Sequence, residues 1–175
     1  MIGADGLWSN GREILIGDWP PRISGHIAYR AVLPTTKMPK HLRWNEVFLW
    51  AGPWTHLVQY PLRRGEIFNL VAVFQSDRYE EGWDVFGDAE ELFEQFAGEH
   101  PHVLELLGRT ASWPMWVLCD REPIKDWSQG PVTLLGDAAH PMLQYLAQGA
   151  CMAIEDAVCR AHQLAAHDGN YTPAF

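Results

Sequence analysis

The chain of 175 residues has few cysteines, no long apolar run and no excess of basic residues. Its three cysteines, Cys119, Cys151 and Cys159, lack C-x-x-C spacing, so neither a disulfide framework nor a thiolate metal site is indicated. We interpret them as reduced thiols of a cytoplasmic protein. No signal peptide and no run of about 18 apolar residues occurs, so neither export nor a membrane span is predicted. The net charge of -9 argues against nucleic acid and anionic membranes as partners.

Several catalytic patterns are also absent. No G-x-S-x-G elbow occurs, so serine hydrolase chemistry is not indicated. The eight histidines show no H-E-x-x-H spacing, and no metal site is predicted. No G-x-G-x-x-G turn, which would receive a dinucleotide pyrophosphate, is present.

The composition that remains is that of a globular protein with a proper core. Hydrophobic residues make up 47% and charged residues 20% of the chain. Nine tryptophans are an unusually large number. We expect most of them, including Trp44, Trp50, Trp54, Trp113 and Trp116, to lie in the core or on a sheet face.

The apolar pattern predicts a sheet followed by helices. Closely spaced strands at 26–33, 47–51, 56–60 and 67–74 indicate an antiparallel meander. Helices are expected at 88–96, with Asp88 as the N-cap, and at 101–107. Strands at 113–119 and 132–135 follow. A last helix after Gly149 has small apolar residues at three- and four-residue spacing, so we expect it to pack closely against another element.

Residues 132–149 form the most informative segment. A short buried strand leads directly to Asp137, and a loop then leads to the helix that begins near Gly149. The first turn of a helix offers unpaired backbone N–H groups and a partial positive charge. A junction of this kind suits an anionic or carbonyl-rich ligand. The residues alone therefore predict a ligand site without naming the ligand.

Two motifs resemble those of the FAD-dependent aromatic hydroxylases, the group of p-hydroxybenzoate and salicylate hydroxylases. The segment Gly136-Asp-Ala-Ala-His-Pro141 resembles the second flavin-binding motif, and Gly3-Ala-Asp-Gly6 with Ser9 and Arg12 resembles the middle motif. The segment 140–156 is most similar to the branch of 3-hydroxybenzoate 6-hydroxylase and salicylate hydroxylase. The resemblance covers nearly the whole chain. It implies FAD as the cofactor and NADH or NADPH as the co-substrate.

The resemblance also implies which residues bind the flavin. It places Asp137 against the ribityl or ribose hydroxyls of FAD, although an Asp here could simply cap a turn. Asp5 is the acid of the middle motif, while Arg12 could instead form an ion pair on the surface. The backbone at 146–149 is expected to face the isoalloxazine edge, where a helix N-terminus stabilises a reduced flavin; an ordinary loop-to-helix turn is the alternative. The expected cofactor-binding residues are Asp5, Arg30, Gly136, Asp137, Pro141, Ala147, Gln148 and Gly149.

Two further residues are candidates for catalysis. His56 lies in an apolar strand of the presumed substrate domain and could help to deprotonate a phenol, because its reference pKa is near neutrality. A core or surface histidine is the alternative. Gln144 could contact the same phenolic hydroxyl. His140 is interpreted as structural.

The resemblance and the absent glycine pattern together predict a fragment. Members of the family open with a strand and a G-x-G-x-x-G turn, whereas this sequence begins almost inside the middle motif. The expected fold class is α+β, with an antiparallel substrate-domain sheet flanked by helices. Three segments are expected: 1–25 and 121–175 from a truncated FAD-binding domain, and 26–120 as the substrate-binding sheet domain.

Three functional hypotheses follow. The first is a parent monooxygenase that hydroxylates a phenolic or hydroxybenzoate substrate with FAD, NAD(P)H and O₂. The second is a catalytically inactive remnant that acts as a folding or homo-oligomerisation module, since exposed apolar surface would favour self-association. The third is another flavoprotein of the same fold, such as a halogenase or a lipid epoxidase, against which residues 142–145 argue.

Overall fold

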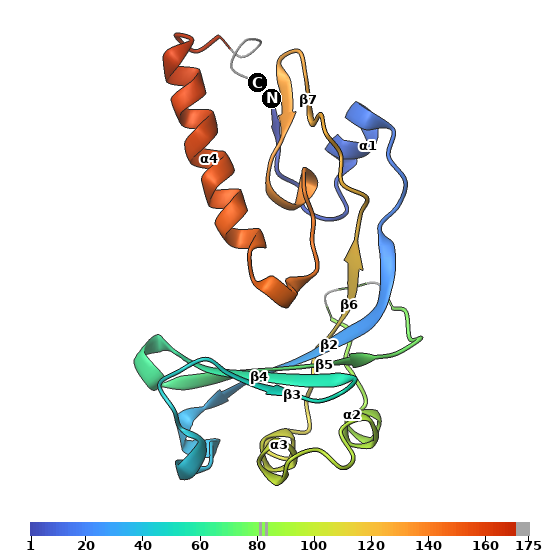
Figure 1. Cartoon of the computed structure of the whole chain (residues 1–175), viewed down its shortest axis with the longest axis vertical. Helices are drawn as coiled ribbons and strands as arrows, with labels where there is room; N and C mark the ends of the chain where they lie inside the picture. The colour runs from blue at the N-terminus through green and yellow to red at the C-terminus, as the bar shows by residue number, and fades with distance from the viewer. Residues whose placement is uncertain (81, 83, 171–175) are drawn as a thin grey trace. The chain divides into compact units, whose positions relative to one another are not determined.

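The structure is a computed structural model that describes residues 1–80, 82 and 84–170 (Figure 1). The last five residues of the predicted segment 121–175 therefore lie outside the described residues. The chain divides into two compact units. We call Gly25–Leu118 the sheet unit, and we call Met1–Ser24 together with Cys119–Phe175 the split unit.

A five-stranded sheet with the order β3-β4-β5-β2-β6 forms the centre of the sheet unit. Three of its pairings, β3 with β4, β4 with β5 and β5 with β2, are antiparallel. The short connections predict the first two of these pairings. The predicted meander would place β2 beside β3, whereas the structure places β2 beside β5. The short helix η3 links β4 to β5, and η1 and η2 follow β2. The bounds are β2 Arg22–Pro34, β3 Phe48–Ala51, β4 Thr55–Leu62, β5 Ile67–Gln75, β6 Met115–Asp120, η1 Thr35–Lys37, η2 Lys40–Leu42 and η3 Arg63–Gly65.

The core of the sheet unit lies between one face of this sheet and two helices. The helices α2 (Ala89–Gln95) and α3 (Pro101–Leu107) lie on the same side of the sheet (Figure 1). Side chains alternate between the two faces of a strand, so every second residue of β2 and β5 enters this core. Ile27, Tyr29 and Phe74 are all fully buried there.

The ends of both helices follow from local sequence. The Asp88 carboxylate accepts the Glu90 backbone N–H at 2.8 Å, as expected of an N-cap. Pro101 occupies the first turn of α3, where its missing N–H costs nothing. The sequence therefore predicted the position of both helices.

The split unit is built around a small three-stranded sheet with the order β1-β8-β7. Strand β1 is parallel to β8, although about 130 residues separate them, and β7 is antiparallel to β8. Its apolar core consists of Leu134, Ala138 and Ala139 with a few half-buried neighbours. The bounds are β1 Ile2–Gly3, α1 Asn10–Ile16, β7 Ser128–Gln129, β8 Val132–Leu134, η4 Gly136–Ala138, η5 Gln144–Leu146 and α4 Gly149–Ala166.

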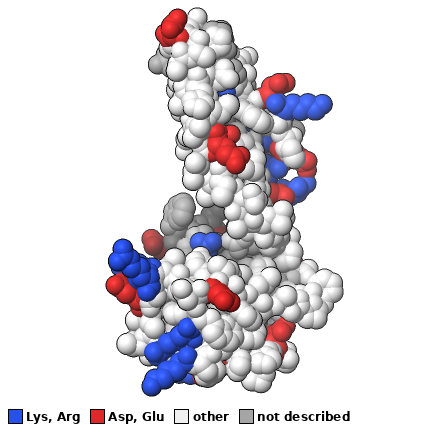
Figure 2. All heavy atoms as spheres, turned by 60° about the vertical axis from the view of Figure 1, so that its left-hand side comes forward, with Lys and Arg blue, Asp and Glu red and all other residues white. Residues whose placement is uncertain are grey.

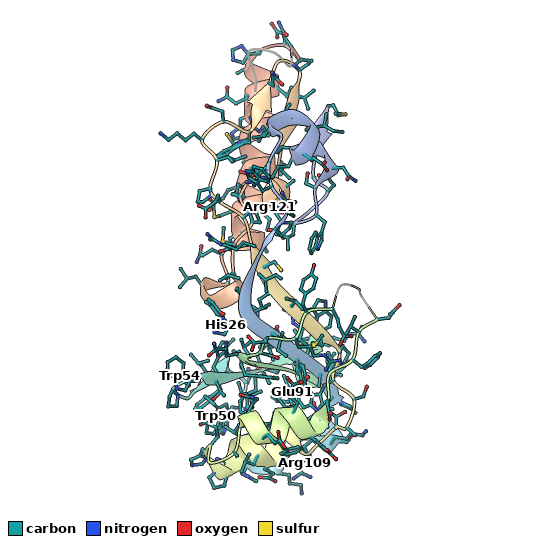
Figure 3. All side chains as sticks on the ribbon, turned by 90° about the vertical axis from the view of Figure 1, so that its right-hand side faces the viewer. His26, Trp50, Trp54, Glu91, Arg109 and Arg121 are labelled. Atoms are coloured by element: carbon teal, nitrogen blue, oxygen red, sulfur yellow. The ribbon has the colours of Figure 1, made fainter. Side chains whose placement is uncertain are left out.

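The predicted α+β fold class is confirmed by these elements. Helix α1 and strand β1 were not predicted, because both are short and lack an apolar period. One packing expectation was wrong. Trp54 lies in the turn between β3 and β4 and is 78% exposed (Figure 3). Helix α4 has no buried residue, and Figure 2 shows its forward face as largely uncharged.

The close packing expected of α4 is confirmed at η4, although no side chain of α4 is buried there. Alanines permit a close approach to a neighbouring element but cannot by themselves create one. The closest approach is at η4, where a Cβ added to Gly136 would lie 3.3 Å from the Ala153 Cβ. None of the described helices is long and apolar enough to cross a bilayer.

Candidate functional site

The turn that carries Asp137 leaves the end of β8. Leu135 is still extended, and Gly136 then adopts a left-handed φ of 60°, which glycine reaches without strain. The backbone N–H groups of Ala139 and His140 both donate to the Gly136 carbonyl at 2.9 Å. The Asp137 side chain is exposed, and its carboxylate has no hydrogen-bond partner among residues 1–80, 82 and 84–170. A tight turn therefore presents an unpaired anion to solvent.

The N-terminus of α4 lies next to this carboxylate. A Cβ added to Gly149, the first residue of α4, would lie 3.6 Å from the Asp137 Oδ1. Gln148 precedes the helix and makes no side-chain capping bond to its first turn. The backbone N–H groups of that turn are thus not satisfied by an N-cap side chain.

The connection between the Asp137 turn and α4 contains most of the other expected flavin-binding residues. Pro141 is half-buried, whereas Ala147 and Gln148 are exposed. Ala147 has a left-handed φ of 51°, and its backbone N–H donates to the Gln144 carbonyl at 3.0 Å. A left-handed alanine costs about 1 kcal/mol, and such strain is concentrated at functional sites. The structure thus brings the expected residues from Gly136 to Gly149 onto one short connection.

Arg12 fixes the middle motif to this turn. Its guanidinium donates to the Asp18 carboxylate at 2.5 Å, to the Ala139 carbonyl at 3.0 Å and to the Glu122 carbonyl at 2.8 Å. Arg12 does form an ion pair, with Asp18, but the prediction that it lies on the surface was wrong, because Arg12 is completely buried. Burial by itself raises the pKa of Asp18, but the hydrogen bonds from Arg12 and the Trp19 N–H outweigh it and lower that pKa.

Asp5 is engaged in the structure of the middle motif itself. Its carboxylate accepts the Ser9 hydroxyl at 2.5 Å and the Gly11 backbone N–H at 3.0 Å. Ser9 in turn accepts the Arg12 N–H at 2.8 Å and caps α1. Burial raises the pKa of Asp5, but the Gly11 and Ser9 hydrogen bonds outweigh this and lower it. A contact between Asp5 and FAD stays a prediction.

Sequence reasoning missed Arg121, which is also nearly fully buried. Its guanidinium donates to the Leu7 carbonyl at 2.8 Å and the Trp19 carbonyl at 2.7 Å, and lies 3.5 Å from the Asp18 carboxylate (Figure 3). Within the sequence it stands among charged residues, so it resembles an ordinary surface arginine. No local pattern identifies it, because its partners are about 100 residues away.

His56 lies on the sheet face opposite the two helices. Its Cα neighbour is Val73 in β5, whose partner in β2 is Ala28. His26, Ala28 and Arg30 therefore share this face, because alternate residues of a strand point the same way. Burial lowers the pKa of His56, and the charge interaction with His26 lowers it further. The lower pKa favours the neutral imidazole, which is the form that can accept a proton.

Arg30 lies farther along the same face. Its guanidinium stands over the Trp116 ring, 5.2 Å from the centroid, which is the geometry of a cation–π contact. Both line a hollow of about 490 Å³ together with Asn69, Thr110 and Ser112. Arg30 and His56 belong to the sheet unit, whereas Asp137, Gly149 and Gln144 belong to the split unit. The proposed roles of Arg30, His56 and Gln144 stay predictions.

Curated relatives match nearly the whole chain. The 3-hydroxybenzoate 6-hydroxylase 1 of Aquipseudomonas alcaligenes is 52% identical over 164 residues, covering 94% of this chain and 42% of the relative. The 3-hydroxybenzoate 6-hydroxylase of Klebsiella oxytoca is 49% identical over 176 residues, covering 100% of this chain and 44% of the relative. The chain thus spans less than half the length of these relatives.

A solved structure and a family model agree with these relatives. A salicylate hydroxylase substrate complex superposes with a TM-score of 0.85 at 27% identity, covering 98% of this chain and 47% of that structure. The family model described as FAD binding domain matches residues 1–169, which include both motifs and every expected site residue. FAD is the cofactor of this family. The chain belongs to the FAD binding domain family.

Proposed function

We propose that this chain is the flavin- and substrate-binding part of an aromatic monooxygenase that hydroxylates a phenolic or hydroxybenzoate ring with FAD, NADH or NADPH, and O₂. The observation that carries the proposal is the Asp137 carboxylate, which has no partner within the described part of the chain and lies beside the N-terminus of α4. The relatives named 3-hydroxybenzoate 6-hydroxylase support the substrate class. Phenols with a ring carboxylate are therefore the first substrates to test.

The residues of the split unit fit a flavin dinucleotide. An exposed carboxylate without a partner can accept hydrogen bonds from ribityl or ribose hydroxyls. Gly149 has no side chain to keep a ligand from the backbone, and the first turn of α4 offers N–H groups to a carbonyl or an anion. When bound, FAD supplies the redox chemistry with NAD(P)H and O₂.

The connection before α4 would orient the flavin ring. Pro141, Ala147 and Gln148 would line its edge through backbone and apolar atoms. The partial positive charge of the helix N-terminus would stabilise negative charge on the reduced ring without a charged side chain. Gly136 would support this arrangement by permitting the tight turn before Asp137.

His56 would act on the substrate hydroxyl. A neutral imidazole can accept the phenolic proton, and burial keeps the pKa of His56 below its usual value. Gln144 is proposed to hydrogen-bond a phenolic hydroxyl, and Arg30 is proposed as a further cofactor-binding residue. A phenolate is the more electron-rich ring, so removal of this proton would favour hydroxylation.

Titration of the purified chain with FAD tests the cofactor site. We expect saturable binding by the wild type and a dissociation constant about tenfold or more higher for Asp137→Ala, because a hydrogen bond to a charged group is lost. Asp77→Ala removes an exposed acid of the sheet unit and should bind like the wild type. Equal affinities of the wild type and Asp137→Ala would contradict the role of Asp137.

Transient kinetics of an active enzyme that carries this chain test His56. We expect His56→Ala to slow hydroxylation by about 100-fold or more while flavin reduction by NAD(P)H changes little. The reason is that general base catalysis by His56 would serve hydroxylation and not flavin reduction. His41→Ala, at an exposed histidine, is the matched control. Equal slowing of both steps would contradict the base role of His56.

One observation favours a second function, self-association. Helix α4 exposes Ile154 at 65% and Val158 at 52%, and an exposed apolar face favours association. Sedimentation of the wild type and of Ile154→Asp distinguishes a monomer from a dimer. A dimer that Ile154→Asp dissociates would support a homo-oligomerisation module, whereas a monomeric wild type would contradict it.

A further inference from the structure

Asp156, on α4, holds the turn that carries Asp137. Its Oδ2 accepts the Gly136 backbone N–H at 2.9 Å and lies 2.6 Å from the His140 Nε2. Both partners flank Asp137 in the sequence. The Asp156 side chain is about one-fifth exposed, so water competes only partly for these hydrogen bonds.

His140 depends on Asp156 for its polar contact. Its Nδ1 is buried and has no hydrogen-bond partner among the described residues, which leaves the Nε2 contact with Asp156 to orient the ring. The remaining contact is apolar, with the Trp127 ring edge-on at 5.9 Å between centroids. The carboxylate therefore fixes a backbone group on one side of Asp137 and a side chain on the other.

The same helix also forms the other half of the candidate cofactor site. Gly149, at the start of α4, lies beside the Asp137 carboxylate, and Asp156 follows about two helical turns later. A helix is rigid over this length. The hydrogen bond between Asp156 and Gly136 therefore fixes the position of Asp137 relative to the N-terminus of α4. Gly136 and Ala153 also pack closely, but this apolar contact does not fix the orientation of the turn as a hydrogen bond does.

We infer that Asp156, together with His140, is a positioning residue that holds the Asp137 turn against α4 for cofactor binding. The inference rests on the proposed function, because FAD is the ligand that Asp137 would contact. Asp156 itself touches no cofactor in this role. Its removal loosens the turn while the carboxylate of Asp137 and the helix N-terminus both remain.

Two measurements on the full chain test the inference. The first is amide hydrogen exchange at Gly136 without cofactor, and the second is the dissociation constant for FAD. For Asp156→Ala we expect about tenfold faster exchange at Gly136 and about tenfold weaker FAD binding, because a charge-assisted hydrogen bond is lost. Asp156→Asn keeps an acceptor oxygen and should restore much of both. Glu155→Ala removes the neighbouring exposed acid and should match the wild type.

The outcomes separate this inference from the proposed function. Unchanged Gly136 exchange in Asp156→Ala would overturn the inference, whatever happens to FAD binding. A loosened turn with wild-type FAD affinity would overturn the positioning role. If the wild-type chain binds no FAD, the proposed cofactor site of this chain fails, and faster Gly136 exchange in Asp156→Ala would still support Asp156 as the residue that fixes the turn.

Discussion

The sheet unit and the split unit are each stabilised internally by a different kind of interaction. The sheet unit has one large apolar core between its sheet and two helices, with Trp113, Phe74 and Tyr29 completely buried. The apolar core cluster of the split unit, within the described part of the chain, consists of Leu134, Ala138 and Ala139. Its segments are joined instead by buried guanidinium groups, those of Arg12 and Arg121, which donate to backbone carbonyls.

This difference determines how each unit responds to change. Apolar burial is not directional, so its free energy is shared among many side chains. A buried hydrogen-bonded charge is directional, and loss of one group leaves several partners unsatisfied. Single hydrogen-bonded residues therefore matter in the split unit, and one of them, Arg12, contacts the turn that carries Asp137 through the Ala139 carbonyl.

The largest effect is expected in the core of the sheet unit. Phe74→Ala should lower the free energy of unfolding by about 3–5 kcal/mol, because a fully buried ring is replaced by a cavity. Ile154→Ala on α4 should change it by no more than about 0.5 kcal/mol, since that side chain is mostly exposed. Urea denaturation of both variants measures the difference. Equal losses would contradict the contrast between the units.

A smaller but still severe effect is expected at the buried guanidinium of the split unit. Arg12→Met should lower the free energy of unfolding by about 3 kcal/mol, because Asp18 and two carbonyls lose their donor. Arg22 pairs with Asp120 and Glu122 on the surface, where water screens the charges, so Arg22→Met should lower the free energy of unfolding much less than Arg12→Met does. Urea denaturation and amide exchange at Ala139 measure both variants. A cost for Arg12→Met as small as that for Arg22→Met would show that the network contributes little.

The smallest effect is a pH dependence at His56. Its pKa is lowered in the folded protein, so the unfolded chain binds a proton more readily as the pH falls through the usual range for histidine. Wild-type stability should therefore decrease on acidification from about pH 8 to about pH 5, and His56→Gln should remove this part of the decrease. Melting curves across this range measure it, and parallel pH profiles for the two proteins would contradict the shift.

The repeating patterns of the chain made part of the fold predictable. Short apolar runs bounded by turn residues identified β4 and β5, and the Asp88 cap and Pro101 identified α2 and α3. The strand–turn–helix pattern placed Asp137 next to a helix start, and the structure shows that proximity. These features depend on residues close in the sequence, so local physical chemistry specifies them.

The sequence by itself therefore determined the order of the main elements, the two motifs and the turn that presents Asp137. Only the tertiary structure decided that Arg12 is buried, that α4 has no buried residue and that Asp156 holds Gly136 and His140. Arg12 and the Ala139 carbonyl are 127 positions apart. No local preference encodes such a contact, because it forms only when β1 and β8 pair and bring distant segments together.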